Sequence, residues 1–545
     1  VNRRVVGAVR VFERTMPGQC VDTCLEEGSA SLSERSSEDI NNIVNSPESD
    51  LIVDLEPNLV KGVPLQVSLS GWGRHWVAPD SGMFNVDPAN YELSQVVEAY
   101  DAFLSHEWAS SRWLKLFTLL MVFNSGPAFW ACLFVSLAVG LGRACEVLPN
   151  ELWTAALGHL TFFVVFAFYQ RIRLLFARPL MVFLDKLCIA QHDEELKSKG
   201  ILGLPTFLLK SKKLLVLWTP RYCSRLWCAL EMATFMKDPK YHDSIEIVPL
   251  KTTIILAAEG LAWSIMSVGY NMMESAIAAQ AEQEAQPNHT ENVITVVTLM
   301  MLFGTAIVPV VFYVGLGLIA EVEELPRQLA EFRVQDCQCF CCTNNHKHPN
   351  TGEELPCDRE LVFRSLKGWY PQPEQDHLDF FNSTVRSNLA PRVAAGTAGG
   401  VLPARYTLYM VGACNLPFLS RLFPAWAGHV HNGIVGYKLV ALVLRSSMSW
   451  MIVGLAAVGT TRVSMHLFRL GNYLSRVCLK SRLCWVALLT PLSFQVATLL
   501  WTPYEVVKVM TPKDSMLPVM PFLAALAVVV YLLAFPGLTQ KGAAS

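Results

Sequence analysis

Long stretches without a charged residue constrain this chain more than any other feature. Five segments of 19 residues or more contain no Asp, Glu, Lys or Arg, namely residues 116–142, 152–170, 292–320, 483–504 and 515–540. A helix of about 20 apolar residues is long enough to cross the roughly 30 Å hydrocarbon core of a bilayer. Only 17% of the residues are charged and 52% are hydrophobic, so we predict a polytopic α-helical membrane protein.

Three weaker segments raise the expected number of spans to about eight. Residues 252–273 contain one acid, Glu259, whereas Arg and Lys interrupt or flank residues 402–423 and 434–458. The connections between spans predict three groups: a hairpin at residues 116–170, a second hairpin with a luminal loop at 252–320, and a C-terminal bundle at 402–540.

The distribution of Lys and Arg predicts the orientation of these spans. Basic residues flank the first hairpin on the side that carries residues 181–250, whereas the connectors within the first two hairpins are acidic or neutral. Because Lys and Arg are enriched on cytosolic ends, we expect an integral membrane protein with cytosolic N- and C-termini and a cytosolic 321–400 region. The sequon at Asn288 then falls on the opposite, glycosylation-competent face.

The rest of the composition limits the classes of partner. Residues 1–95 are polar and rich in Ser, Glu and Asn, which favours a disordered N-terminal region. A net charge of −2 creates no field that would recruit nucleic acid. We therefore expect membrane lipids as partners, and no nucleic acid.

Residues 96–115 and 171–250 follow a different pattern from the spans. Short apolar runs such as VFLD and LLVLW alternate with polar loops and with segments of helical spacing. This alternation is typical of a parallel α/β sheet. With YDAFLS as its first strand, the sequence predicts one cytosolic α/β domain that is split by the first membrane hairpin.

The order of these segments resembles a TIR domain, which implies a flavodoxin-like sheet. The four strands of the family are matched by residues 100–105, 182–185, 214–217 and 247–249, and residues 186–200 stand where its BB loop would be. The most specific match is YCSRLWCALEM at residues 222–232, which is similar to the family's Y-x-S-x-x-W-C-x-x-E-L helix. The segments LDKLCIAQ and RLWCALE are similar to those of membrane-anchored protist proteins.

The chain departs from the family between the first two strands, where the family has one short helix. A parallel pair of strands needs a crossover that returns to the same end of the sheet. A hairpin of two membrane spans meets that need, because it brings the chain back to the membrane face that it left.

The resemblance also implies a candidate activity for Glu231. Some TIR domains cleave NAD⁺ at the nicotinamide glycosidic bond, using a glutamate on the helix that contains Glu231 here. A carboxylate beside the ribose would stabilise oxocarbenium character as the bond breaks. Other TIR domains only assemble with like domains. An NAD⁺ glycohydrolase that requires no cofactor, and an assembly module that binds itself or other TIR-like domains, therefore both stay open.

Polar residues at the ends of the first two strands are the candidates for ligand binding, because ligands bind outside the carboxyl ends of open α/β sheets. They are Ser105, His106 and Trp108 after the first strand, and Asp185 and Cys188 after the second. A surface position for His106, and a role for Asp185 in capping the BB loop, are alternatives.

A cluster of cysteines and histidines follows the fourth span. Cys339 and Cys342 have CxxC spacing, and His346, His348 and Cys357 come next. Thiolates and imidazoles at such spacing suit tetrahedral Zn²⁺. Palmitoylation and free reduced thiols are the alternatives.

Charged residues within apolar segments raise one further alternative. Glu259, Lys438 and Arg445 lie where an isolated charge is costly. Interfacial positions or pairing between helices account for them most simply. A transporter with a regulatory cytosolic domain is the third function that the sequence leaves open, beside the enzyme and the assembly module.

Overall fold

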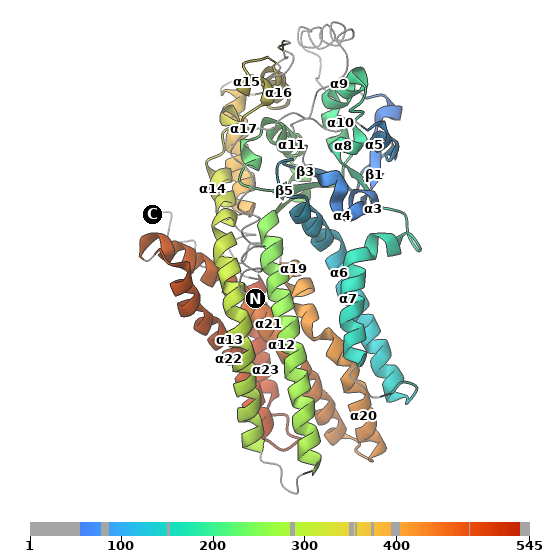
Figure 1. Ribbon diagram of the computed structural model, residues 1–545, viewed down its shortest axis with the longest axis vertical. Coiled ribbons are helices and arrows are strands. Elements are labelled where there is room, and N and C mark those ends of the chain that lie inside the picture. Colours follow the sequence, from blue (N-terminus) through green and yellow to red (C-terminus); the bar gives the residue numbers. More distant parts are fainter. Residues whose placement is uncertain are drawn as a thin grey trace.

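The computed structural model describes residues 55–77, 87–149, 153–283, 289–347, 352, 354, 357–371, 375–393, 404–478 and 480–534. A sheet with its covering helices lies at one end of the long axis, and long helices run from it to the other end (Figure 1). The molecule therefore has a mixed α/β part and a helical bundle, with the candidate site near the junction between them.

The sheet has six strands in the order β2-β1-β4-β3-β5-β6. The strands are β1 (Lys61–Pro64), β2 (Gln95–Val96), β3 (Ala102–His106), β4 (Met181–Phe183), β5 (Leu214–Trp218) and β6 (Ile245–Pro249). β4, β3, β5 and β6 are parallel, whereas β1 pairs antiparallel with both β4 and β2. Every residue of β3 and β5 is buried, as expected for central strands of a covered parallel sheet.

Short helices connect the parallel strands. α8 (Asp185–Cys188), α9 (Glu194–Leu202) and α10 (Leu204–Leu209) lie between β4 and β5. The turn η3 (Tyr222–Ser224), α11 (Leu226–Met236) and η4 (Pro239–Ser244) lie between β5 and β6. All but two residues of α11 are buried, Trp227 and Glu231 being partly exposed. α11 is thus a central packing element, and it carries Glu231.

The prediction of a disordered region for residues 1–95 is wrong for the described part of that region. Residues 55–77 and 87–96 form η1 (Pro57–Leu59), β1, α3 (Leu65–Ser68), α4 (Ser70–Gly73), η2 (Arg74–Trp76), α5 (Pro88–Glu92) and β2. The side chains of Val63, Leu65 and Trp76 are fully buried. The composition of the whole segment hides this ordered part, because a few apolar residues are enough to extend a sheet that already exists.

Six described helices are long and apolar enough to cross a membrane, which supports the predicted membrane-protein class. They are α6 (Arg112–Ala144), α7 (Trp153–Arg173), α12 (Leu250–Gln283), α13 (His289–Val322), α21 (Tyr437–Val477) and α22 (Arg482–Met510). α6 and α7 form a hairpin between the parallel strands β3 and β4. α23 (Val519–Ala534) is a shorter apolar helix within the last expected span.

The span expected at residues 402–423 is not one continuous helix, and the irregular segment extends to residue 431. α19 (Ala404–Met410) is followed by the 3₁₀ helix η7 (Gly412–Arg421) and by α20 (Leu422–His431). Together these pieces follow the length of the bundle beside α6 and α12 (Figure 1). A ten-residue 3₁₀ helix is unusual, because such helices rarely exceed three or four residues.

Asn415 and three glycines explain how the bundle holds this broken segment. Trp450 Nε1 donates to the Asn415 backbone oxygen at 2.8 Å, and the Asn415 amide donates in turn to the Trp450 oxygen. A Cβ at Gly158 would lie 2.7 Å from Pro417 Cβ, and one at Gly260 would lie 2.6 Å from the Met410 oxygen. A Cβ at Gly140 would lie equally close to the Phe423 ring, at 2.7 Å. The surrounding helices can therefore approach the irregular backbone and bury it.

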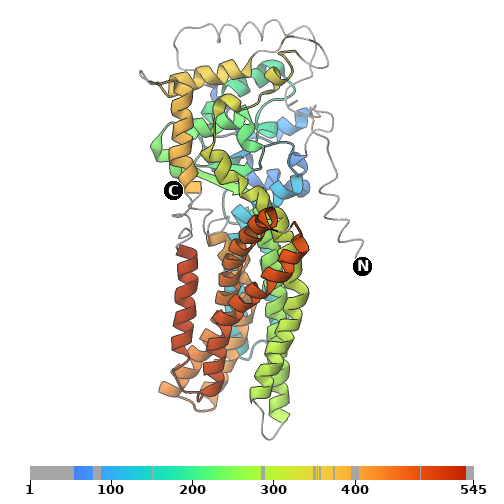
Figure 2. The same cartoon turned by 90° about the vertical axis from the view of Figure 1, so that its left-hand side faces the viewer.

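The segment after α13 returns to the sheet and packs on α11. It contains α14 (Glu324–Ala330), η5 (Val334–Asp336), α15 (Phe340–Thr343), α16 (Asp358–Trp369), α17 (His377–Thr384) and the π-helical turn η6 (Val385–Leu389). Figure 2 shows α16 and α17, in gold, at the same end of the molecule as the sheet. Tyr370, just after α16, donates from its hydroxyl to the Ala233 oxygen of α11 at 2.7 Å.

Candidate functional site

The carboxyl ends of the parallel strands face the helical bundle. β3 ends at His106 and α6 begins at Arg112, whereas β6 ends at Pro249 and α12 begins at the next residue. The hydroxyls of Thr118 on α6 and Thr253 on α12 are 2.9 Å apart, so the two helices meet just below the sheet. The edge where ligands of open α/β sheets bind is therefore the edge next to the bundle.

Ser105 and Glu231 meet at this edge. Ser105 is the last residue but one of β3, and its hydroxyl donates to a carboxylate oxygen of Glu231 on α11. The hydroxyls of Ser105 and Tyr222 are also 2.5 Å apart. Ser105 and Tyr222 are each 1% exposed, whereas Glu231 is partly exposed. A buried hydroxyl network thus holds the carboxylate, on a residue that is itself partly exposed.

The surroundings of Glu231 favour its protonated form. The pKa of this carboxyl is raised from 4.5 to about 8, chiefly by desolvation, and the negative charge of Asp185 contributes to the rise. The hydrogen bond from Ser105 and the positive charge of Arg225 act in the opposite direction. Perturbed carboxyl groups of this kind concentrate at functional sites, although ion-pair networks also produce them.

Asp185 stands at the start of α8 and faces Trp108. Trp108 Nε1 donates to Asp185 Oδ2 at 2.9 Å, and the Lys186 backbone N–H donates to Oδ1 at 2.7 Å. Burial raises the pKa of Asp185, and these two hydrogen bonds oppose that rise. Asp185 is thus a buried carboxyl group at the end of β4, and its negative charge contributes to the raised pKa of Glu231.

His106 is a neutral core residue in this structure. It is 9% exposed, and its ring packs edge-on against Trp76 at 4.9 Å and Trp108 at 4.5 Å between centroids. Its Nδ1 lies 3.2 Å from the Leu104 oxygen. Burial, together with the positive charge of Lys115, lowers the pKa of His106 well below 6.5. His106 thus packs against Trp108 and helps to hold its ring in place.

Cys188, at the end of α8, is a buried thiol in contact with backbone groups of β4 and the residue after it. Its sulfur accepts from the Leu184 backbone N–H at 3.4 Å and lies 3.9 Å from the Val182 oxygen. Burial raises the pKa of the thiol to about 12, so it stays protonated at neutral pH. These contacts assign Cys188 to the core beneath β4.

Lys115 and Tyr222 are the neighbours of the site that the sequence did not single out. Lys115 on α6 is fully buried, its Nζ donates to the Trp108 oxygen at 3.1 Å, and it lies 5.3 Å from the Trp108 ring centroid. The sequence offered no signal for this role, because Lys115 matches the basic flank of a span. Tyr222 belongs to the YCSRLWC segment, so its motif could have indicated it.

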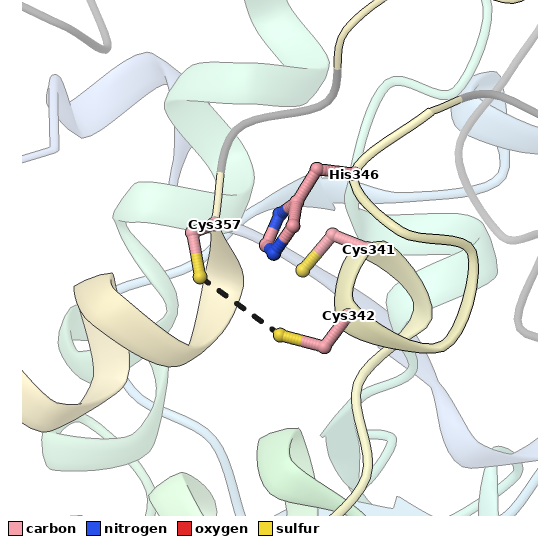
Figure 3. Close-up of side chains that lie close together, drawn as sticks. All are labelled: Cys341, Cys342, His346 and Cys357. Atoms are coloured by element: carbon pink, nitrogen blue, oxygen red, sulfur yellow. Dashed lines mark hydrogen bonds between the residues drawn. The ribbon is translucent and has the colours of Figure 1, made fainter.

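The cysteine and histidine cluster that the sequence predicts as a metal site contains a partly different set of residues in the structure (Figure 3). Cys342, His346 and Cys357 come together, and the fourth member of their group is Cys341. Cys339 lies beside this group, with its sulfur 3.5 Å from that of Cys341. His348 and the sequon residue Asn288 lie outside the described residues.

Compared with protein-family models, with curated proteins and with solved structures, the chain matches none of them.

Proposed function

We propose that this chain is a membrane-anchored TIR-like signalling protein whose α/β domain cleaves NAD⁺. The observation that carries the proposal is the hydrogen bond between Ser105, near the carboxyl end of β3, and Glu231. The negative charge of Asp185, at the end of the neighbouring strand, contributes to the raised pKa of Glu231. The strand order β4-β3-β5-β6 also supports the proposal, because numbering these strands along the chain gives 2-1-3-4, as in flavodoxin-like sheets.

The chemistry required is the breaking of one glycosidic bond. The bond between the ribose C1′ and the nicotinamide nitrogen breaks, and its electron pair leaves with neutral nicotinamide. Water adds to the ribosyl cation and loses a proton. An ionised Glu231 beside C1′ would stabilise the cation as it forms. Ser105 would hold that carboxylate through the hydrogen bond already present.

Nicotinamide release by the purified full-length protein tests this proposal. Wild type is expected to release nicotinamide from NAD⁺, and Glu231→Gln is expected to lose at least about 100-fold in rate, as when a transition-state stabiliser is removed. Glu195→Gln is the matched control, because the Glu195 side chain is 68% exposed on α9. Equal rates for wild type and Glu231→Gln would remove the role of Glu231. No nicotinamide release by wild type would remove NAD⁺ cleavage, and self-association of the protein would then favour an assembly module.

The position of the site suggests what signalling means here. The expected cytosolic sheet is joined to the bundle at the carboxyl ends of two strands, because α6 begins at Arg112 after β3 and α12 begins at Leu250 directly after β6. A change in the packing of these two helices would therefore reach the site over a few residues. In this proposal the bundle receives the stimulus and the TIR-like edge delivers the output, either as a product of NAD⁺ or by assembly with like domains.

A specific observation also favours a second function, transport through the bundle. Broken helices at the middle of a bundle are typical of transporter binding sites, and η7 interrupts a membrane-length segment. Glu259 is 5% exposed beside this segment; its Oε2 accepts from Thr461 at 3.3 Å, and its Oε1 has no hydrogen-bond partner among the described residues. One turn further along α12, Trp263 lines a cavity of about 80 Å³.

Proton flux in proteoliposomes separates this function from the first. A transporter that uses Glu259 should lose flux in the Glu259→Gln variant and keep it in Glu146→Gln, whose side chain is exposed in the loop after α6. Equal flux in wild type, both variants and empty liposomes would exclude it. The Glu231→Gln variant should leave flux unchanged, so the two functions are tested independently.

A further inference from the structure

Three cysteines and one histidine form a compact group on the segment that packs on α11. The ligand atoms of Cys341, Cys342, His346 and Cys357 all lie within 4.8 Å of one another. In Figure 3 the three sulfur atoms and the imidazole ring point toward a common centre. Cys341 is buried, Cys342 and Cys357 are partly buried, and His346 is exposed. The group therefore lies just beneath the surface.

The distances suit a tetrahedral metal. Zn–S bonds of about 2.3 Å place two sulfur atoms of one tetrahedron roughly 3.8 Å apart. The sulfur atoms of Cys342 and Cys357 are 3.9 Å apart. A disulfide would need about 2.05 Å, so this pair has the spacing of two ligands of one ion.

The backbone brings the four ligands together from two separate segments. Cys341 and Cys342 lie on α15, and the next residues, Asn345 and His346, have φ values of 53° and 57°. Such values are uncommon outside glycine, although Asn and His adopt them more readily than most residues. An antiparallel bridge between Lys347 and Glu354 then returns the chain, and Cys357 becomes the N-cap residue of α16.

Backbone groups close to the cysteines fit sulfur atoms that act as ligands. The backbone N–H of Asp358 donates to the Cys341 sulfur at 3.2 Å. Cys357 is the N-cap residue of the 12-residue helix α16. Hydrogen bonds to ligating sulfur are a usual part of zinc sites, because they orient and tune the ligand.

We propose that Cys341, Cys342, His346 and Cys357 bind one structural Zn²⁺ as a closed Cys₃His site. With four protein ligands no coordination position is left for substrate, so the ion acts as a cross-link between α15 and α16. Cys339 does not belong to this group of four, although it has CxxC spacing with Cys342 and its sulfur is 3.5 Å from that of Cys341. Acylation fits less well, since Cys341 is 2% exposed.

The metal would also order the surface that holds α11. Trp227 Nε1 donates to Asp358 Oδ2 at 3.3 Å, one residue after the ligand Cys357. The Gln338 backbone accepts from the Leu226 N–H at 3.0 Å and donates to the Ser224 oxygen at 2.7 Å. These contacts fix the N-terminal end of the helix that carries Glu231. Metal binding itself does not depend on the proposed function.

Metal analysis of the purified full-length protein tests the site. Wild type is expected to carry about one zinc per chain, and Cys341→Ser or Cys357→Ser should lower that content about tenfold or more. Cys339→Ser is the matched control and should keep the zinc. Cobalt-loaded wild type should show the absorption bands of tetrahedral thiolate coordination.

Two variants of the histidine ligand keep the test decisive if the serine variants misfold. His346→Cys should keep zinc and alter the cobalt spectrum, whereas His346→Ala should lose affinity for the metal. The proposal is overturned if wild type carries no zinc, if Cys339→Ser loses zinc while Cys341→Ser keeps it, or if hydroxylamine releases a fatty acid from Cys342 or Cys357. None of these readouts requires enzyme activity, so a failed nicotinamide assay leaves the metal result unaffected.

Discussion

Lys115 in the first turn of α6 donates a hydrogen bond from Nζ to the backbone oxygen of Trp108 at 3.1 Å. Trp108 in turn donates from Nε1 to Asp185 at 2.9 Å. A helix of membrane-spanning length is thereby linked to a carboxyl group at the candidate site through a single intervening residue. This link gives the bundle a physical route to the edge of the sheet.

Replacing Lys115 should therefore damage both stability and the site. Lys115→Met keeps much of the buried side-chain volume but leaves the Trp108 oxygen without its Nζ donor, which costs about 1–3 kcal/mol for a buried group. We expect a lower melting temperature in detergent and slower nicotinamide release. Arg112→Met, three residues earlier on the same helix, is the control and should change both values much less.

The raised pKa of Glu231 predicts the pH dependence of the proposed reaction. The carboxylate is the active form, and its pKa is about 8, so kcat/KM should rise with pH, reach half of its maximum near pH 8 and approach a plateau about one pH unit higher. Initial rates of nicotinamide release between pH 5 and pH 9 measure this profile. A flat profile in that range would contradict the role given to the ionised side chain.

Ser105 should set the position of that profile. Its hydrogen bond lowers the pKa of Glu231, so Ser105→Ala should move the rise in kcat/KM to higher pH and reduce the rate at pH 7. Ser110→Ala is a suitable control, since Ser110 bonds to the Glu107 backbone oxygen. An unchanged profile in Ser105→Ala would show that this hydrogen bond does not act on the reacting carboxyl.

Glu231→Gln should stabilise the fold in a pH-dependent way. A carboxyl whose pKa is raised by folding binds its proton more tightly in the folded protein, so wild type loses stability as pH rises from its ordinary pKa of 4.5 to about 8. The glutamine has no such proton. At about 1.4 kcal/mol per pKa unit, the variant should gain up to a few kcal/mol at pH 9 and almost nothing at pH 4.

Melting temperatures of wild type and Glu231→Gln at both pH values check this. The expected result is a difference that grows with pH. If the difference were the same at pH 4 and pH 9, the proton on Glu231 would not be linked to folding.

Gly260 tests how the bundle accommodates its broken segment. A Cβ at this position would lie 2.6 Å from the Met410 oxygen, whereas a Cβ at Gly454 on α21 would meet nothing within 4 Å. Gly260→Ala should lower stability by about 1–3 kcal/mol through overpacking. Gly454→Ala should be neutral or slightly stabilising, because alanine favours a helix. Thermal unfolding in detergent compares the two; equal effects would contradict the close approach of α12 to Met410.

Local patterns of sequence account for the helices and for the central strands. The uncharged runs predict α6, α7, α13 and α22 because burying apolar surface is a property of each segment by itself. The buried runs AFLSH and LLVLW similarly indicate β3 and β5. The motif around Tyr222 singled out Glu231, and strand-end reasoning singled out Ser105 and Asp185.

Tertiary structure decided the features that depend on distant parts of the chain. β1 and the buried Trp76 belong to a segment whose composition favours disorder. They are ordered because β1 pairs with β4 of the sheet and Trp76 is buried in the core. Cys341 rather than Cys339 belongs to the compact group with Cys342, His346 and Cys357, because the fold of the chain around α15 and α16 decides which ligand atoms come together. Residues 404–431 are broken rather than helical throughout, because contacts with four other helices compensate for the lost regularity.

The sequence by itself thus determined where the chain enters apolar surroundings and which residues are able to carry chemistry. Only the tertiary structure decided which of those residues meet. Hydrophobicity and helix propensity act over one or two turns, whereas a site needs side chains from several elements, and their convergence depends on strand pairing, turns and packing across the whole molecule.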